Sequence, residues 1–83
     1  MYYIYVIRSN IHNTRYVGST ENPVKRLQEH NDGQCRYTKG RKPWKLIYQE
    51  SYSSRAEAMK REKFLKSGQG RKWLAETLDK FDK

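Results

Sequence analysis

The stretch that decides the fold is Tyr2-Tyr3-Ile4-Tyr5-Val6-Ile7-Arg8, followed after a short polar gap by Thr14-Arg15-Tyr16-Val17-Gly18-Ser19. The first segment is almost continuously apolar or aromatic, which is typical of a strand buried on both faces. Because side chains alternate along a strand, Tyr3, Tyr5 and Ile7 would share one face, opposite Tyr2, Ile4 and Val6. The two segments together are predicted to form a hairpin over residues 2–19, with a loop of about five residues.

Signals further along the chain predict three helices and a third strand. Asn22-Pro23 is a helix start and Asp32-Gly33 a stop, so a helix is expected from there to about Asn31. Residues 34–42 are expected to form a polar, basic loop, and residues 44–52 alternate as a strand does. The capping-box pattern at Ser54-Arg55-Ala56-Glu57 opens a helix that ends near Gly68. A last helix is predicted from 71 to about 79, with an apolar stripe formed by Trp73, Leu74, Leu78 and Phe81. The expected order is β-β-α-β-α-α.

The length and composition limit which kinds of protein this chain can be. With 83 residues the chain has room for one domain, 1–83, and an aromatic content of 13% is too high for a disordered chain. The net charge of +9 favours nucleic acid as the partner, with an anionic membrane surface as the rival. No stretch is apolar enough to span a membrane, and the N-terminal residues do not resemble a signal peptide. The single cysteine, Cys35, excludes an internal disulfide and a cysteine-based zinc cluster. A cytoplasmic monomer is therefore expected.

Two pairs of residues could carry chemistry. Tyr5 and Tyr16 lie on adjacent strands of the predicted hairpin, where the register could bring them together on one face, although tyrosines in strands usually serve packing. Arg26 and His30 are four residues apart and so lie on one helix face, distinct from that of Leu27, which is expected to point to the core. Arginine can bind a phosphate and histidine can transfer a proton. The alternative is a solvated surface pair.

Glu62 is the most informative single residue. At about 100° per residue from Ala58, Leu65 lies at about −20°, Glu62 at about +40° and Met59 at about +100°, which places a carboxylate in the apolar stripe of its helix. An unpaired buried carboxylate would cost several kcal/mol, so a cation, a bound metal or a water-filled cleft must compensate it. A buried salt bridge with Arg61 or Lys66 is the alternative to a functional site.

The segment from Gly33 to Gln49 contains no acidic residue. Its cations can contact phosphates and its aromatic side chains can stack on bases, although a solvated loop is the alternative. The cations are Arg36, Lys39, Arg41, Lys42 and Lys45, and the interleaved aromatic residues are Tyr37 and Trp44.

Taken together, these residues resemble the GIY-YIG endonuclease superfamily. The two halves of its signature appear as Tyr3-Ile4-Tyr5 and Tyr16-Val17-Gly18, and they are followed in order by Arg26, His30 and Glu62. The match covers about residues 2–66. Arg36-Tyr37-Thr38-Lys39-Gly40 and Arg61-Glu62-Lys63 look like the small, stand-alone bacterial branch, and the chain is also similar to the N-terminal nuclease domain of the bacterial excinuclease.

The resemblance implies an α+β fold with a three-stranded antiparallel sheet flanked by three helices. It also implies hydrolysis of one DNA strand with the help of one divalent metal ion, Mg²⁺ or Mn²⁺. Glu62 would hold the metal and Arg26 would steady the phosphate. Tyr5 rather than Tyr16 would be the general base, assisted by His30, and Tyr16 would orient water or phosphate. The nucleic-acid-binding residues would be Gly18, Ser19, Arg36, Tyr37, Lys39, Arg41 and Lys42.

Three functions remain open at this point. The first is a metal-dependent DNA nuclease, acting on branched or damaged structures in repair or recombination, with a protein partner that supplies substrate recognition. The second is a nucleic-acid-binding module without catalysis. The third is a subunit that docks its basic surface on an acidic protein.

Overall fold

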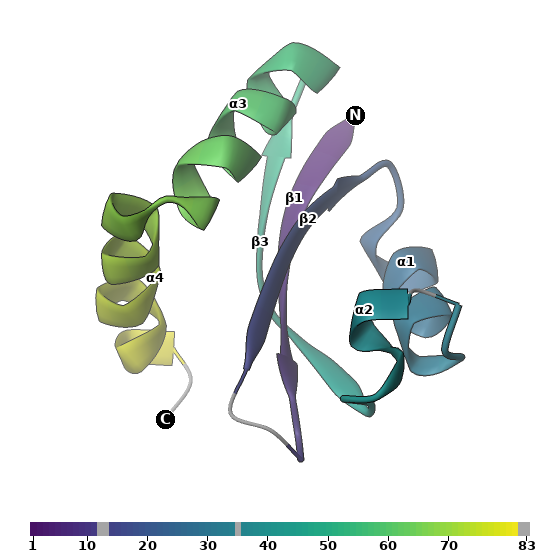
Figure 1. Cartoon of the computed structure of the whole chain (residues 1–83). Coiled ribbons are helices and arrows are strands. Elements are labelled where there is room, and N and C mark those ends of the chain that lie inside the picture. Colours follow the sequence, from purple (N-terminus) through teal and green to yellow (C-terminus); the bar gives the residue numbers. More distant parts are fainter. Residues whose placement is uncertain (12–13, 35, 82–83) are drawn as a thin grey trace.

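A computed structural model describes residues 1–11, 14–34 and 36–81, apart from the side chains of Tyr37 and of residues 79–81. The predicted β-β-α-β-α-α order and α+β class are confirmed (Figure 1). The elements are β1 (Tyr2–Ser9), β2 (Arg15–Thr20), α1 (Pro23–Asn31), α2 (Arg36–Lys39), β3 (Trp44–Tyr52), α3 (Arg55–Lys66) and α4 (Gly68–Phe81). Two details differ from the sequence prediction. The basic loop contains one helical turn, α2, and α4 begins three residues early, at Gly68.

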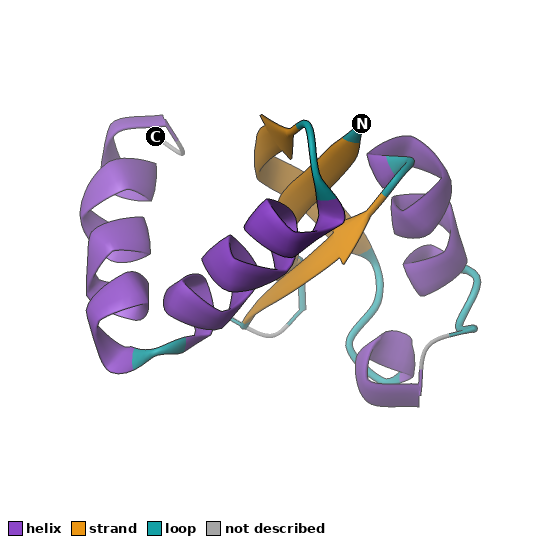
Figure 2. Ribbon diagram, turned by 90° about the horizontal axis from the view of Figure 1, so that it is seen from above, coloured by secondary structure: helices purple, strands orange, loops and turns teal. Residues whose placement is uncertain are grey.

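The sheet is antiparallel and has the order β2-β1-β3. In the central strand Tyr5 pairs with Gly18 on one side and with Gln49 on the other. Ile4, Tyr5, Val6 and Ile7 are all buried, which confirms that β1 is covered on both faces. Helices α3 and α4 lie on one side of the sheet and α1 and α2 on the other, as Figures 1 and 2 show.

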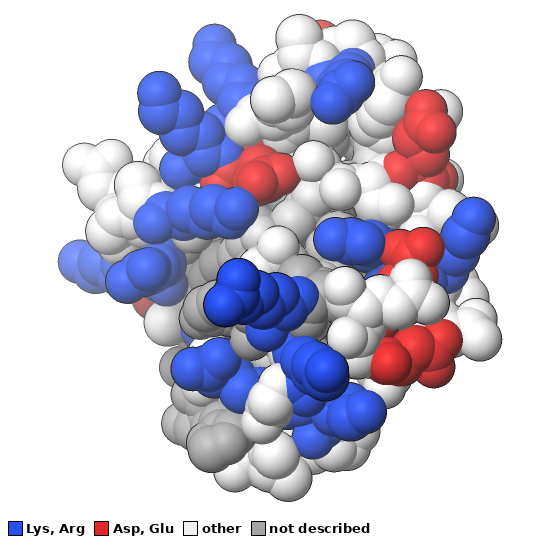
Figure 3. Space-filling view, turned by 45° about the vertical axis from the view of Figure 1, so that its right-hand side comes forward, with Lys and Arg blue, Asp and Glu red and all other residues white. Residues whose placement is uncertain are grey.

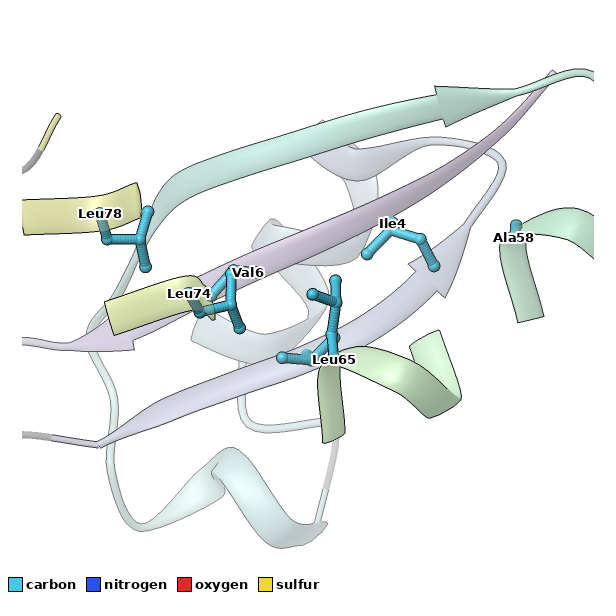
Figure 4. Close-up of a cluster of buried hydrophobic side chains, with 7 residues drawn as sticks. Ile4, Val6, Ala58, Leu65, Leu74 and Leu78 are labelled. Carbon is cyan, nitrogen blue, oxygen red and sulfur yellow. The ribbon is translucent and has the colours of Figure 1, made fainter. Parts of the chain in front are cut away.

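The core is divided by the sheet into two clusters. On the α3–α4 side, Ile4 and Val6 of β1 pack against Leu65, Leu74 and Leu78 (Figure 4). On the α1 side, the cluster consists of Tyr5, Ile7 and Trp44, with the partly buried Tyr16, Leu27 and Leu46 packed against it. The predicted alternation of faces along β1 is therefore confirmed. It sends Ile4 and Val6 into the larger apolar core and Tyr5 into the cluster that also contains polar groups.

Helix α1 is fixed at both ends by side-chain hydrogen bonds. The Asn22 side chain accepts a hydrogen bond from the Lys25 amide at 3.1 Å, as an N-cap does. At the other end, Asn31 accepts from the Trp44 amide at 2.5 Å and donates to the Trp44 carbonyl at 3.1 Å. These two bonds tie the last turn of α1 to the start of β3, and they therefore fix the position of the neighbouring His30.

A polar network between β3 and α3 has no counterpart in the sequence analysis. The Glu50 carboxylate accepts hydrogen bonds from Tyr48 at 2.5 Å, from Tyr52 at 2.6 Å, and from Arg61 Nε and Nη2 at 2.9 and 3.1 Å. Burial by itself raises the pKa of Glu50, but the hydrogen bonds, with that of Arg61 first, outweigh it and hold the pKa below its ordinary value. Burial and Glu50 together raise the pKa of Tyr48 and of Tyr52 to about 12.

Candidate active site

Three rings from three different elements meet on the α1 side of the sheet. Tyr5 of β1 and Tyr16 of β2 have ring centroids 6.3 Å apart. The His30 ring of α1 lies 5.8 Å from the Tyr5 ring and 5.1 Å, edge-on, from the Tyr16 ring. The register of the hairpin explains the first contact, because Tyr5 pairs with Gly18 and Tyr16 with Ile7 on the same face. The expectation that the two tyrosines share one face is confirmed.

His30 is held by hydrogen bonds at both ring nitrogens. Nε2 lies 2.9 Å from the Tyr5 hydroxyl and Nδ1 lies 2.7 Å from Thr38 Oγ1. Thr38 is itself fixed, because Trp44 Nε1 donates to its carbonyl at 2.9 Å. All four of these side chains are buried. Thr38 was absent from the predicted site. Its signals in the sequence are its place in the basic segment and in the stretch Arg36-Tyr37-Thr38-Lys39-Gly40, which resembles the small bacterial branch.

This chain of hydroxyl, imidazole and hydroxyl can hold its protons in two ways. Tyr5 can donate to Nε2 while Nδ1–H donates to Thr38. Alternatively, Thr38 donates to Nδ1 and Nε2–H donates to the Tyr5 oxygen, an arrangement that stabilises negative charge on that oxygen. Burial first, and then the charge of Arg26, hold the pKa of His30 below its ordinary value, although Glu29 acts in the opposite direction. The ring is therefore neutral at neutral pH.

Arg26 lies one turn before His30 at the edge of this cluster. Its Nη1 forms an ion pair with Glu29 Oε1 at 3.0 Å, and 36% of its side chain is exposed. The hydrogen bonds to Glu29 and to Tyr5 raise the pKa of Arg26 above its ordinary value. The alternative of a solvated Arg26–His30 pair is wrong, because His30 is completely buried while Leu27 is only partly buried. The imidazole, which has polar partners on β1 and α2, is the more deeply buried of the two, and Leu27 packs against the same cluster.

Gly18 makes room for the Tyr5 side chain. A Cβ at residue 18 would lie 2.6 Å from Tyr5 Cζ and 2.9 Å from Cε1, and closer still to the hydroxyl oxygen. The resemblance placed Gly18 among the nucleic-acid-binding residues, but in the structure it is buried, and the group that approaches it closely is Tyr5. The neighbouring Ser19 is exposed, as a residue that contacts a ligand would need to be.

Glu62 lies on α3, on the other side of the sheet, and is partly exposed. Lys66 Nζ contacts its Oε2 at 2.8 Å and lies 5.9 Å from the centroid of the Tyr16 ring, so Lys66 connects Glu62 to the tyrosine cluster at the β2 edge. The salt bridge with Lys66 that was the alternative is therefore present, but it is not buried, since 49% of the Lys66 side chain and 24% of the Glu62 side chain are exposed. Arg61 pairs with Glu50 instead, and Met59, which was placed at the edge of the stripe, is 53% exposed.

The basic segment is mostly exposed around α2. Arg36, Lys39, Lys42 and Lys45 are exposed and Arg41 is partly buried, while the Tyr37 side chain lies outside the described residues. Figure 3 brings this side of the molecule forward and shows Lys and Arg gathered over its lower part and its left, with most acidic side chains at the right. The expectation that Trp44 could stack on bases is wrong, because it is 3% exposed and belongs to the core.

The donor set around Glu62 fits a metal held mainly by water and substrate. Among the residues that the structure describes, no three His, Cys, Asp or Glu side chains gather where they could hold an ion. Mg²⁺ commonly uses one or two carboxylates, several waters and substrate phosphates. A partly exposed glutamate beside basic side chains is compatible with that mode, and Lys66 would have to give up its contact with Oε2.

Comparison with known proteins identifies the family. The model of the GIY-YIG catalytic domain matches residues 1–74. The chain belongs to the GIY-YIG family. Its GIY-YIG fold is also that of a UPF0213 protein from Bacillus halodurans, whose solution NMR structure matches with a TM-score of 0.56 and 28% identity, over 93% of this chain and 85% of the other.

Several relatives of similar length support membership of the small, stand-alone GIY-YIG group. A UPF0213 protein of Staphylococcus haemolyticus is 42% identical over 67 residues, which is 80% of each chain. One of Natronomonas pharaonis is 40% identical over 67 residues, 80% of this chain and 78% of the other. None of the helices in the described part of this GIY-YIG domain is long and apolar enough to cross a membrane.

Proposed function

We propose that this GIY-YIG domain hydrolyses phosphodiester bonds in nucleic acid, with DNA as the substrate and one divalent metal ion as the cofactor. The observation that carries the proposal is the meeting of Tyr5, Tyr16, Arg26 and His30, which come from three elements. A partly exposed arginine with a fixed positive charge suits a phosphate, and a tyrosine–histidine pair suits proton transfer.

The burial of the two tyrosines suggests how they divide the work. Tyr5 is 1% exposed, and its hydroxyl forms a hydrogen bond with His30. Its role is therefore to hold His30 and Arg26 in place. Tyr16 is only partly buried and faces the edge where Lys66 and Glu62 lie, so it is the better candidate to contact the attacking water. This differs from the general-base role that the resemblance assigned to Tyr5.

The remaining roles follow from charge and exposure. Arg26 would bind the non-bridging oxygens of the phosphate, and the exposed cations around α2 would hold the flanking backbone. A divalent ion bound through Glu62 would neutralise charge on the leaving oxygen. When Thr38 donates to Nδ1, the Nε2–H of neutral His30 can donate to the Tyr5 oxygen and stabilise negative charge there, and Arg26 supplies positive charge nearby.

The test is a substrate panel. Purified protein is incubated with end-labelled duplex, single-stranded, flap and four-way DNA, and with RNA, in Mg²⁺, Mn²⁺ or EDTA. The proposal expects metal-dependent cleavage of DNA that both Tyr16→Phe and Arg26→Ala abolish. Preference for flap or four-way DNA would support a role in repair or recombination.

A module that binds nucleic acid without cleaving it is the second candidate. The observation in its favour is that Lys66 forms an ion pair with Glu62, the carboxylate that would otherwise bind the metal ion. In that case the panel would show no cleavage in any metal. Binding would still be salt-dependent, at about 10⁻⁴–10⁻⁶ M at physiological salt.

A further inference from the structure

A pocket lies beside the candidate active site, where the edge strand β2 meets α3 and α4. Its volume is about 630 Å³, and it is lined by residues 14–17 of the hairpin and by Leu65, Lys66, Arg71 and Leu74. That volume is within the usual range for small-molecule sites. Tyr16 and Lys66 line this pocket and also take part in the candidate active site, so the pocket adjoins the site at the β2 edge of the sheet.

The lining has two chemical characters. Leu65 and Leu74 are almost fully buried and give the pocket an apolar floor, to which Val17 also contributes. Arg15, Lys66 and Arg71 are exposed and carry three positive charges from three elements. One of these cations, Lys66, pairs with Glu62. An occupant should therefore combine a flat apolar part with an anionic part.

We propose that this pocket binds one unpaired nucleotide of a nucleic-acid substrate, next to the phosphate that the site engages. The base lies on the apolar floor beside the Tyr16 ring, and Arg15, Lys66 and Arg71 contact the adjoining phosphates. A base inside a duplex is stacked and paired and cannot enter such a pocket, whereas an extruded or single-stranded base can. This inference rests on the proposed function and narrows its substrate to DNA with an unpaired nucleotide near the cleaved bond.

Binding in EDTA tests the inference without cleavage. The probes are a fluorescent duplex that is fully paired and the same duplex with one unpaired 2-aminopurine. We expect the wild type to bind the second about tenfold more tightly, an effect of the size that base–aromatic stacking provides. The 2-aminopurine fluorescence should also change as the base leaves water.

Charge-reversal variants locate the effect. Arg15→Glu and Arg71→Glu should each remove the preference, so that the variant binds the two probes with nearly equal affinity. Lys72→Glu is the matched control, since it changes the charge by the same amount on an exposed residue of α4 that does not line the pocket. It should weaken binding to both probes and keep the preference. Melting curves of all three variants check that they fold.

The inference is overturned if the wild type binds both probes equally, or if Lys72→Glu removes the preference as fully as Arg71→Glu does. Tight binding of an acidic peptide that competes for Arg15 and Arg71, without any preference for the unpaired base, would equally overturn it. A preserved preference in a protein that cleaves nothing in Mn²⁺ would instead contradict the proposed hydrolysis and leave the pocket assignment standing.

Discussion

The Tyr5 hydroxyl occupies the space that a side chain at residue 18 would need. The two residues are direct partners across β1 and β2, and the same hydroxyl reaches His30 Nε2 at 2.9 Å. The absence of a side chain at Gly18 is therefore what allows a buried tyrosine to lie flat over the hairpin and hold the histidine of α1.

Gly18→Ala should destabilise the protein by about 1–3 kcal/mol, the usual cost of overpacking. The reason is the collision with Tyr5, since the backbone of Gly18 has no positive φ. A double-mutant cycle with Tyr5→Phe, measured by urea unfolding, is the check. Because phenylalanine removes the oxygen that lies closest, we expect the two effects to couple by at least about 0.5 kcal/mol. Strict additivity would show that the strain lies elsewhere.

Thr38→Val should also destabilise the protein by about 1–3 kcal/mol, because it leaves His30 Nδ1 buried without a partner. Thr38→Ser keeps the hydroxyl and is the control, with a smaller loss. If Thr38 positions the His30 ring for proton transfer, valine should also shift the pH profile of cleavage, whereas serine should not. Equal pH profiles for both variants would limit Thr38 to a structural role.

His30 should make the folded state sensitive to mild acid. Its pKa is lowered in the folded protein, so the unfolded chain binds more protons, and this contribution is complete above the unfolded pKa of about 6.5. Stability should fall as the pH drops below about 6.5, by at most about 1.4 kcal/mol per pH unit. Urea unfolding of the wild type and of His30→Gln between pH 7.5 and 5 measures the difference. A wild-type slope that equals the slope of the variant would contradict the prediction.

Glu62→Gln should change stability by no more than about 1 kcal/mol, because Glu62 forms an exposed, helical i,i+4 pair with Lys66. Metal-dependent cleavage should nevertheless be lost, and Mn²⁺ should broaden NMR signals near residue 62 in the wild type only. Glu57→Gln, at an exposed position of the same helix, is the control and should retain both properties. Unchanged broadening in Glu62→Gln would remove Glu62 from the metal site.

Arg61→Met should cost about 3 kcal/mol, since it leaves the Glu50 carboxylate without its cation between β3 and α3. It also removes the guanidinium that lies 4.6 Å from the centroid of Trp73 and 5.0 Å from that of Phe64. Lys63→Met removes an exposed cation of α3 and should cost less than about 0.5 kcal/mol. Thermal melts of the two variants that coincide would show that the Glu50 network contributes little.

The secondary structure was largely determined by local sequence. The apolar run of β1, the Asn22-Pro23 start of α1 and the Ser54 cap of α3 are signals carried by neighbouring residues, and the structure uses all three. The side-chain period of two along a strand likewise fixed which residues of the hairpin share a face, and so brought Tyr5 and Tyr16 together.

Burial and pairing across elements were decided only by the tertiary structure. Helical spacing placed His30 near Arg26, but Thr38 and Tyr5, which come from α2 and β1, made it favourable to bury the imidazole. Helical spacing likewise placed two cations, Arg61 and Lys66, near Glu62. Because Glu50 of β3 binds Arg61, Glu62 pairs with Lys66 alone of these two. The physical reason is that the cost of burying a polar group depends on partners that are distant in the sequence.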